Sequence, residues 1–223
     1  MELPQDEEPL AITPDMLAEE QPEERVDFER GMSYWSPGTL ALLVTLVAVF
    51  GWQLTSGAFD SQNALIDAGA LVRSRVIEGE TWRLFSATVL HGSGDHLFGN
   101  CVALYILGIA CEHALGAWRL LVLYLASGLA GSIASVLTGP GPSVGASGAI
   151  CGLMGGVLVV LFRYRHVYHV RNKEIAWVLA GWAAYTIFIG ALDPRIDNWA
   201  HLGGLLGGAV IAFGLRPRVT LAA

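Results

Sequence analysis

Residues 120–162 read LLVLYLASGLAGSIASVLTGPGPSVGASGAICGLMGGVLVVLF and contain no charged side chain. A helix needs about 20 mostly apolar residues to cross the roughly 30 Å hydrocarbon core of a bilayer. This stretch is therefore long enough for two membrane spans. The turn-forming sequence TGPGP at residues 138–142 divides it, which predicts one span over 119–138 and another over 146–162.

The rest of the chain continues this apolar pattern. The sequence is 53% hydrophobic and only 15% charged, a composition typical of integral membrane proteins. Further apolar segments predict spans over 37–53, 95–112, 174–191 and 198–215. The predicted fold class is an all-α membrane protein with six transmembrane helices. The first loop, residues 58–90, is long and partly amphipathic, which indicates a structured element lying at the membrane interface.

The negative charge of the chain lies in its N-terminal segment. The formal net charge is −7, and residues 1–32 contain eleven acidic and two basic side chains. Such a segment is too polar to bury a core, so residues 1–32 are predicted to be a disordered acidic tail and 33–223 the membrane domain. No basic stripe is present, so nucleic acid is not an expected partner.

Six spans would place both termini on the same side of the membrane. Nine Arg or Lys residues then lie on that side and four on the other, which predicts cytoplasmic termini because basic residues favour the cytoplasmic side. The predicted location is the inner (plasma) membrane, crossed several times. This orientation brings Ser147, His201, His96 and Asn100 to one depth near the outer face.

Ser147 is a polar residue in a predicted membrane segment, where polar groups are costly. A serine in such a helix commonly bonds only the backbone carbonyl one turn back. Ser147, however, follows a turn and is flanked by Gly145 and Gly148. It can therefore stand at a helix N-terminus, whose free N–H groups suit a developing oxyanion.

His201 is a candidate general base for this serine. A histidine in an apolar site stays neutral and can accept the hydroxyl proton. Asp197, in the preceding loop, is expected to be solvated or to cap a helix. Because no carboxylate is placed to orient His201, the sequence predicts a serine hydrolase with a Ser147/His201 dyad.

Two glycine ridges predict how the serine and the histidine meet. Glycines recur every four residues in two of the predicted spans, at Gly148, Gly152 and Gly156 in one and at Gly204 and Gly208 in the other. Small residues at this spacing let membrane helices approach closely. Packing these two ridges together would bring Ser147 towards His201.

His96 and Asn100 are candidate oxyanion partners. They are four residues apart and so lie on one helical face, where both can donate hydrogen bonds alongside the Ser147 N–H. No HExxH or comparable metal cluster is present, and no cofactor is expected. Three cysteines, Cys101, Cys111 and Cys151, lie in apolar segments without CxxC spacing and are interpreted as structural thiols.

Over roughly residues 37–215 the chain resembles the rhomboid intramembrane serine proteases. The motifs that carry the resemblance are Trp82-Arg83, His96-x-x-x-Asn100, Glu112-x-x-x-Gly116, Gly145-x-Ser147-Gly148 and Ala200-His201-x-x-Gly204-x-x-x-Gly208. The resemblance implies a six-helix rhomboid-like bundle whose active site is a water-filled cavity open to the outside. Substrates would be transmembrane proteins cleaved in or near a membrane segment.

The resemblance also assigns residue roles. Ser147 would be the nucleophile and His201 the base, with His96 and Asn100 as oxyanion partners. Trp82, Arg83 and Glu112 would be structural. Many family members carry an aromatic residue one turn after the serine that stacks on the base histidine, whereas this chain has Cys151.

The sequence disfavours two other functions. A rhomboid-like protein that binds membrane-protein clients without cleaving them is disfavoured because both Ser147 and His201 are present. A small-solute transporter is disfavoured because the sequence shows no inverted repeat and no pair of interrupted helices.

Overall fold

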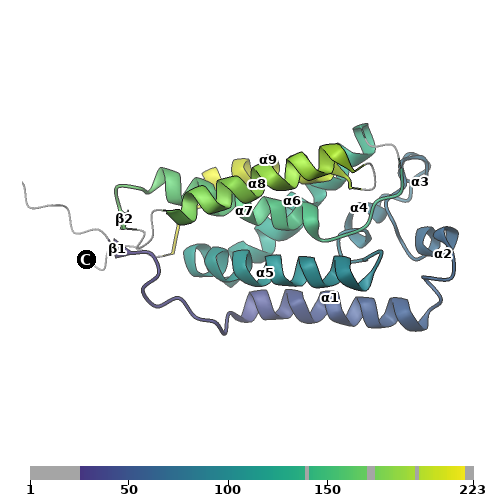
Figure 1. Ribbon diagram of the computed structural model, residues 1–223, viewed down its shortest axis with the longest axis horizontal. Coiled ribbons are helices and arrows are strands. Elements are labelled where there is room, and N and C mark those ends of the chain that lie inside the picture. Colours follow the sequence, from purple (N-terminus) through teal and green to yellow (C-terminus); the bar gives the residue numbers. More distant parts are fainter. Residues whose placement is uncertain (1–25, 139–140, 170–173, 194–195, 219–223) are drawn as a thin grey trace, which may run out of the picture.

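The computed structural model describes residues 26–138, 141–169, 174–193 and 196–218. Its longer helices form a bundle (Figure 1). These are α1 (Pro37–Thr55), α5 (Gly94–Leu115), α6 (Ala117–Thr138), α7 (Ser147–Arg163), α8 (Glu174–Leu192) and α9 (Asn198–Gly214). Each begins and ends within three residues of a predicted span.

The membrane-crossing capacity of these helices differs. Among the described residues, α1, α5 and α6 are long and apolar enough to cross a bilayer, and α7 and Trp177–Leu192 are shorter apolar helices. The chain is therefore a helical, multi-pass membrane protein, while the count of six spans stays a prediction.

Helix α7 lies at the centre of the bundle. It packs against α5, α6, α8 and α9, and most of its residues are buried from Gly148 to Leu161. Its large apolar side chains, including Leu153 and Val157, pack in one core with Leu104 and Leu107 of α5 and Leu123 of α6. In Figure 1 α1 lies on the outer side of α5, and α8 lies beside α9.

The first loop contains three short helices, α2 (Gln62–Asp67), α3 (Arg73–Ile77) and α4 (Arg83–Ser86). Arg83 is only 3% exposed, and its guanidinium donates to the carbonyls of Ile66 and Ala70. It also pairs with Glu80 at 2.5 Å, which holds the pKa of that carboxyl below its usual range. One buried arginine thus ties the loop together, because its fork of donors satisfies several acceptors at once. The place of this loop at the membrane interface stays a prediction.

Two further motif residues, Glu112 and Trp82, make defined contacts in the structure. The carboxylate of Glu112 accepts hydrogen bonds from the backbone N–H groups of Gly38 (3.0 Å) and Thr39 (2.8 Å) and from the Thr39 hydroxyl (2.8 Å). It therefore satisfies free donors of the first turn of α1 and joins that turn to α5. Trp82 is half-exposed, and the Arg83 guanidinium lies 4.6 Å from its ring centroid.

Ordered structure begins before the boundary predicted at residue 32. Strand β1 (Val26–Asp27) pairs in parallel with β2 (Tyr168–His169), and Phe28, 4% exposed, contacts the rings of His113 and Tyr168. Residues 26–32 belong to the described structure, where the Phe28 ring is buried against the bundle, and the disorder predicted for 1–32 stays a prediction. Residues 1–25 lie outside the described part of the chain.

Candidate active site

Ser147 is the first residue of α7, as the Pro/Gly turn predicted. The preceding Gly145 has φ +136°, a conformation that side-chain-bearing residues rarely adopt. Its N–H donates to the carbonyl of Ala87 (2.8 Å), which fixes the turn against the end of the first loop. Ser147 thus stands where α7 leaves its first N–H groups without helical partners.

His201 lies against Ser147. The distance between His201 Nε2 and Ser147 Oγ is 2.8 Å, although the two residues are 54 positions apart. Helix α9 begins just before the histidine, where the Asp197 carboxylate accepts from the Ala200 N–H (3.0 Å) and from the Ser135 hydroxyl. Of the two expectations for Asp197, solvation or helix capping, the structure shows the cap, which sets where His201 falls on α9.

No carboxylate forms a hydrogen bond with the His201 ring within the described residues. Its Nδ1 atom is buried without a hydrogen-bond partner, and the side chain is 7% exposed. Acceptance of a proton from Ser147 at Nε2 requires the tautomer with the proton on Nδ1. Cys151, one turn after the serine, is buried as well.

The predicted close approach of the two glycine ridges is confirmed. A Cβ atom added at Gly204 would overlap the carbonyl oxygen of Gly148, and one at Gly208 would overlap that of Gly152. Backbone therefore packs on backbone between α7 and α9, which only residues without a side chain allow. Gly156 differs, since its open side faces Leu123 of α6.

His96 and Asn100 lie on α5 beside the turn that carries the serine. A Cβ atom at Gly145 would lie 2.7 Å from His96 Cε1 and 3.6 Å from Asn100 Nδ2. Asn100 is 7% exposed, and its Nδ2 is buried without a hydrogen-bond partner in the described structure. The Asn100 amide is therefore an unused hydrogen-bond donor beside the turn that carries Ser147.

Gln53 and His91 form a neighbouring pair that the sequence analysis did not identify. The Gln53 side chain accepts from the His91 N–H and donates to the His91 carbonyl, both at 3.0 Å. Both residues are fully buried, and the His91 ring lies edge-on to that of His96, with 5.2 Å between centroids. The sequence offered one indication of this pair, because Gln53 is a polar residue at the end of an otherwise apolar predicted span.

His91 should make the stability of the protein depend on pH. Burial lowers the pKa of His91 to about 4, and the nearby His96 contributes a smaller part of this shift. The unfolded chain, with an ordinary histidine pKa near 6.5, therefore binds this proton more readily between pH 6.5 and 4. The free energy of unfolding should therefore fall by up to about 3 kcal/mol as the pH is lowered from 6.5 to 4. Melting curves of the wild type and His91→Phe between pH 7.5 and 4.5 test this, and equal pH slopes would contradict it.

The cavity beside the candidate site is small. Its volume is about 20 Å³, and its lining includes Thr88, Ser132, Gly145, Gly148 and Ala200. That volume holds about one water molecule. Within the described residues no three His, Cys, Asp or Glu side chains are grouped so as to hold a metal ion.

The fold and the site together define a helical membrane protein with a serine–histidine contact at the N-terminus of a buried helix. Residues 78–218 match the family model described as the rhomboid domain, and the chain belongs to the rhomboid family.

Named relatives agree with this membership. The chain is 36% identical over 178 residues to rhomboid protease GluP of Bacillus subtilis (strain 168), and this alignment covers 79% of this chain and 34% of that protein. It is 32% identical over 211 residues to rhomboid protease AarA of Providencia stuartii, covering 80% and 73%. It is 41% identical over 153 residues to RHOMBOID-like protein 5 of Arabidopsis thaliana, covering 67% and 49%. The chain thus spans less than half of GluP and of RHOMBOID-like protein 5.

Proposed function

We propose that this protein is an intramembrane serine endopeptidase that cleaves membrane proteins in or near a transmembrane segment. The observation that carries the proposal is the 2.8 Å contact between His201 Nε2 and Ser147 Oγ at the first residue of α7. Two relatives, GluP and AarA, are named rhomboid proteases, which supports proteolysis as the reaction.

The first half of the proposed reaction acylates the serine. Ser147 Oγ attacks the carbonyl carbon of the scissile bond while its proton passes to His201 Nε2. The carbonyl oxygen becomes an oxyanion, which the Ser147 N–H, Asn100 Nδ2 and His96 would stabilise. The intermediate then collapses: the C–N bond breaks, His201 gives its proton to the leaving amine, and an ester on Ser147 remains.

The second half hydrolyses that ester. A water molecule gives a proton to His201 Nε2 and attacks the ester carbonyl, passing through the same oxyanion. Collapse breaks the bond to Ser147 Oγ, which regains its proton from His201. The new carboxyl terminus leaves, and the enzyme returns to its starting state.

We also propose the membrane arrangement in which this chemistry takes place. The domain from 33 to 223 would cross the inner (plasma) membrane six times with both termini in the cytoplasm. Ser147 at the start of α7 and His96 near the start of α5 would then lie near the outer face. Trp82, Arg83 and Glu112 would hold the first loop and α1 around the site, as their contacts indicate.

A covalent serine probe tests the nucleophile. The full-length protein in detergent should react with a fluorophosphonate, and Ser147→Ala should abolish the labelling because the probe forms a bond to an activated hydroxyl. Ser74→Ala is the matched control, since Ser74 is exposed on α3. Labelling that persists in Ser147→Ala would remove Ser147 from this role.

A second candidate function is client binding by a catalytically weak rhomboid-like protein. The observation in its favour is the His201 Nδ1 atom, which is buried without a partner in the described structure. A histidine that no neighbouring group orients is a less effective base. Absence of probe labelling in the folded wild type, together with capture of transmembrane proteins, would support this function over the first.

A further inference from the structure

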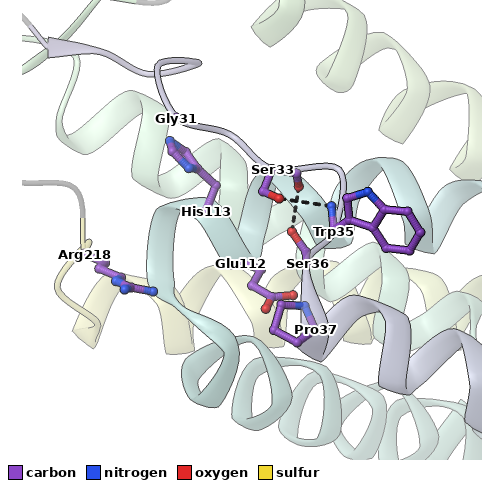
Figure 2. Close-up of a pocket in the computed structure, with 8 residues that line it drawn as sticks. All are labelled: Gly31, Ser33, Trp35, Ser36, Pro37, Glu112, His113 and Arg218. Atoms are coloured by element: carbon purple, nitrogen blue, oxygen red, sulfur yellow. Dashed lines mark hydrogen bonds between the residues drawn. The ribbon is translucent and has the colours of Figure 1, made fainter.

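A second cavity lies at the end of the bundle opposite Ser147. Its volume is about 350 Å³, and its lining includes Ser33, Trp35, Ser36, Glu112, His113 and Arg218. Figure 2 shows Arg218 and His113 on one side of this opening, with Ser33, Ser36 and Trp35 on the other. The two sites lie at opposite ends of α5, because His96 is near the start of this helix and Glu112 is near its end.

The helices that form this cavity indicate how deep it lies in the membrane. It is formed where α1 begins and α5 ends, and both helices are long and apolar enough to cross a bilayer. Arg218 follows the end of α9, and its N–H donates to the carbonyl of Ala114 (2.6 Å). With α1 and α5 crossing the bilayer, the cavity would lie where the hydrocarbon core gives way to lipid headgroups.

The lining offers an anion a cation and hydrogen-bonding groups. The Arg218 side chain is exposed and forms no ion pair with a described residue, and Nε2 of His113 is buried without a hydrogen-bond partner in the described structure. The Ser33 Oγ accepts from the Trp35 N–H (3.1 Å), which leaves its proton available. The acidic Glu112 is already occupied, because its two oxygens accept three hydrogen bonds from the first turn of α1.

Exposed aromatic side chains border the cavity. Trp35 is 82% exposed and its neighbour Tyr34 is 77% exposed. Tryptophan and tyrosine concentrate at membrane–water interfaces, where the ring contacts lipid and the polar atom contacts water. A ligand held here would thus meet a cation, a hydroxyl and an aromatic ring at headgroup depth.

We propose that this cavity binds the phosphate group of an anionic phospholipid, with Arg218 as its main charged contact. A guanidinium pairs with phosphate through two parallel hydrogen bonds, and basic pockets at this depth bind anionic headgroups. Residues 33–223 carry nine acidic and eleven basic side chains, so the membrane domain has no strong general attraction for anions, and selective binding requires a local site. The proposal is independent of proteolysis.

The test is a lipid titration of the full-length protein in nonionic detergent, read by native mass spectrometry. Phosphatidylglycerol should bind about fivefold more tightly than phosphatidylcholine, as expected for one added basic contact. Arg218→Gln should remove that preference. The matched control is Arg216→Gln, because Arg216 is exposed nearby but is not among the lining residues.

Two further arms complete the test. His113→Gln, with its melting temperature measured alongside, should weaken phosphatidylglycerol binding less than Arg218→Gln does. Displacement of the lipid by excess inorganic phosphate would assign the site to the phosphate group alone, and retention would assign it to the complete headgroup. Equal binding of both lipids by the wild type, or equal losses in Arg216→Gln and Arg218→Gln, would overturn the proposal.

Discussion

Gly204→Ala should lower the free energy of unfolding by about 3 kcal/mol or more and reduce proteolysis about a hundredfold. The added Cβ would overlap the carbonyl oxygen of Gly148, and a backbone atom cannot turn aside as a side chain does. Relief of this overlap requires α9 to move away from α7, at a cost typical of severe overpacking. The same movement lengthens the contact from His201 to Ser147, and a displacement of about 1 Å is enough for a hundredfold loss of rate.

The control for this prediction is Gly51→Ala. Gly51 lies within α1, and a Cβ atom added there meets nothing within 4 Å. That variant should melt at or slightly above the wild-type temperature, because alanine favours a helix over glycine. Thermal melting in detergent and cleavage of a single-span substrate measure both effects. A Gly204→Ala variant with wild-type stability and activity would show that α7 and α9 do not pack as described.

Asn100→Ala is expected to lower kcat by about a hundredfold while leaving the fold intact. Its buried Nδ2 has no partner in the described structure, so removing it breaks no hydrogen bond of the resting protein. An oxyanion that forms beside Ser147 would lose a donor, and one such donor is typically worth about 100-fold to 1,000-fold in kcat.

The comparison that isolates this effect uses Asn63→Ala, an exposed site on α2. Single-turnover cleavage separates the chemical step from substrate binding, and fluorophosphonate labelling should slow in parallel with it. An Asn100→Ala variant that turns over at the wild-type rate would exclude Asn100 as an oxyanion partner.

Much of the bundle could be predicted from the sequence because apolar length and glycine spacing are local signals. The uncharged run interrupted at TGPGP predicted α6 and α7 almost to the residue. The spacing of Gly148 and Gly152 against Gly204 and Gly208 then predicted a backbone contact between helices more than 50 residues apart. Small residues carry this information because a close approach is impossible without them.

Other contacts left no local signal. Gln53 bonds the backbone of His91, 38 residues away, and a backbone partner has no sequence signature. The pairing of Val26–Asp27 with Tyr168–His169 joins two segments that are each too short to read as strands. The burial of Phe28 was also not predicted, because residues 1–32 were judged by their average acidic composition and not residue by residue.

The most direct test of the central claim is cleavage of a model single-span substrate by the purified full-length protein in detergent. The account predicts cleavage by the wild type and no detectable cleavage by Ser147→Ala or His201→Ala, with melting temperatures close to the wild type. Cleavage that survives in either folded variant would contradict a Ser147/His201 protease, as would a folded wild type that cleaves no substrate and takes up no serine probe.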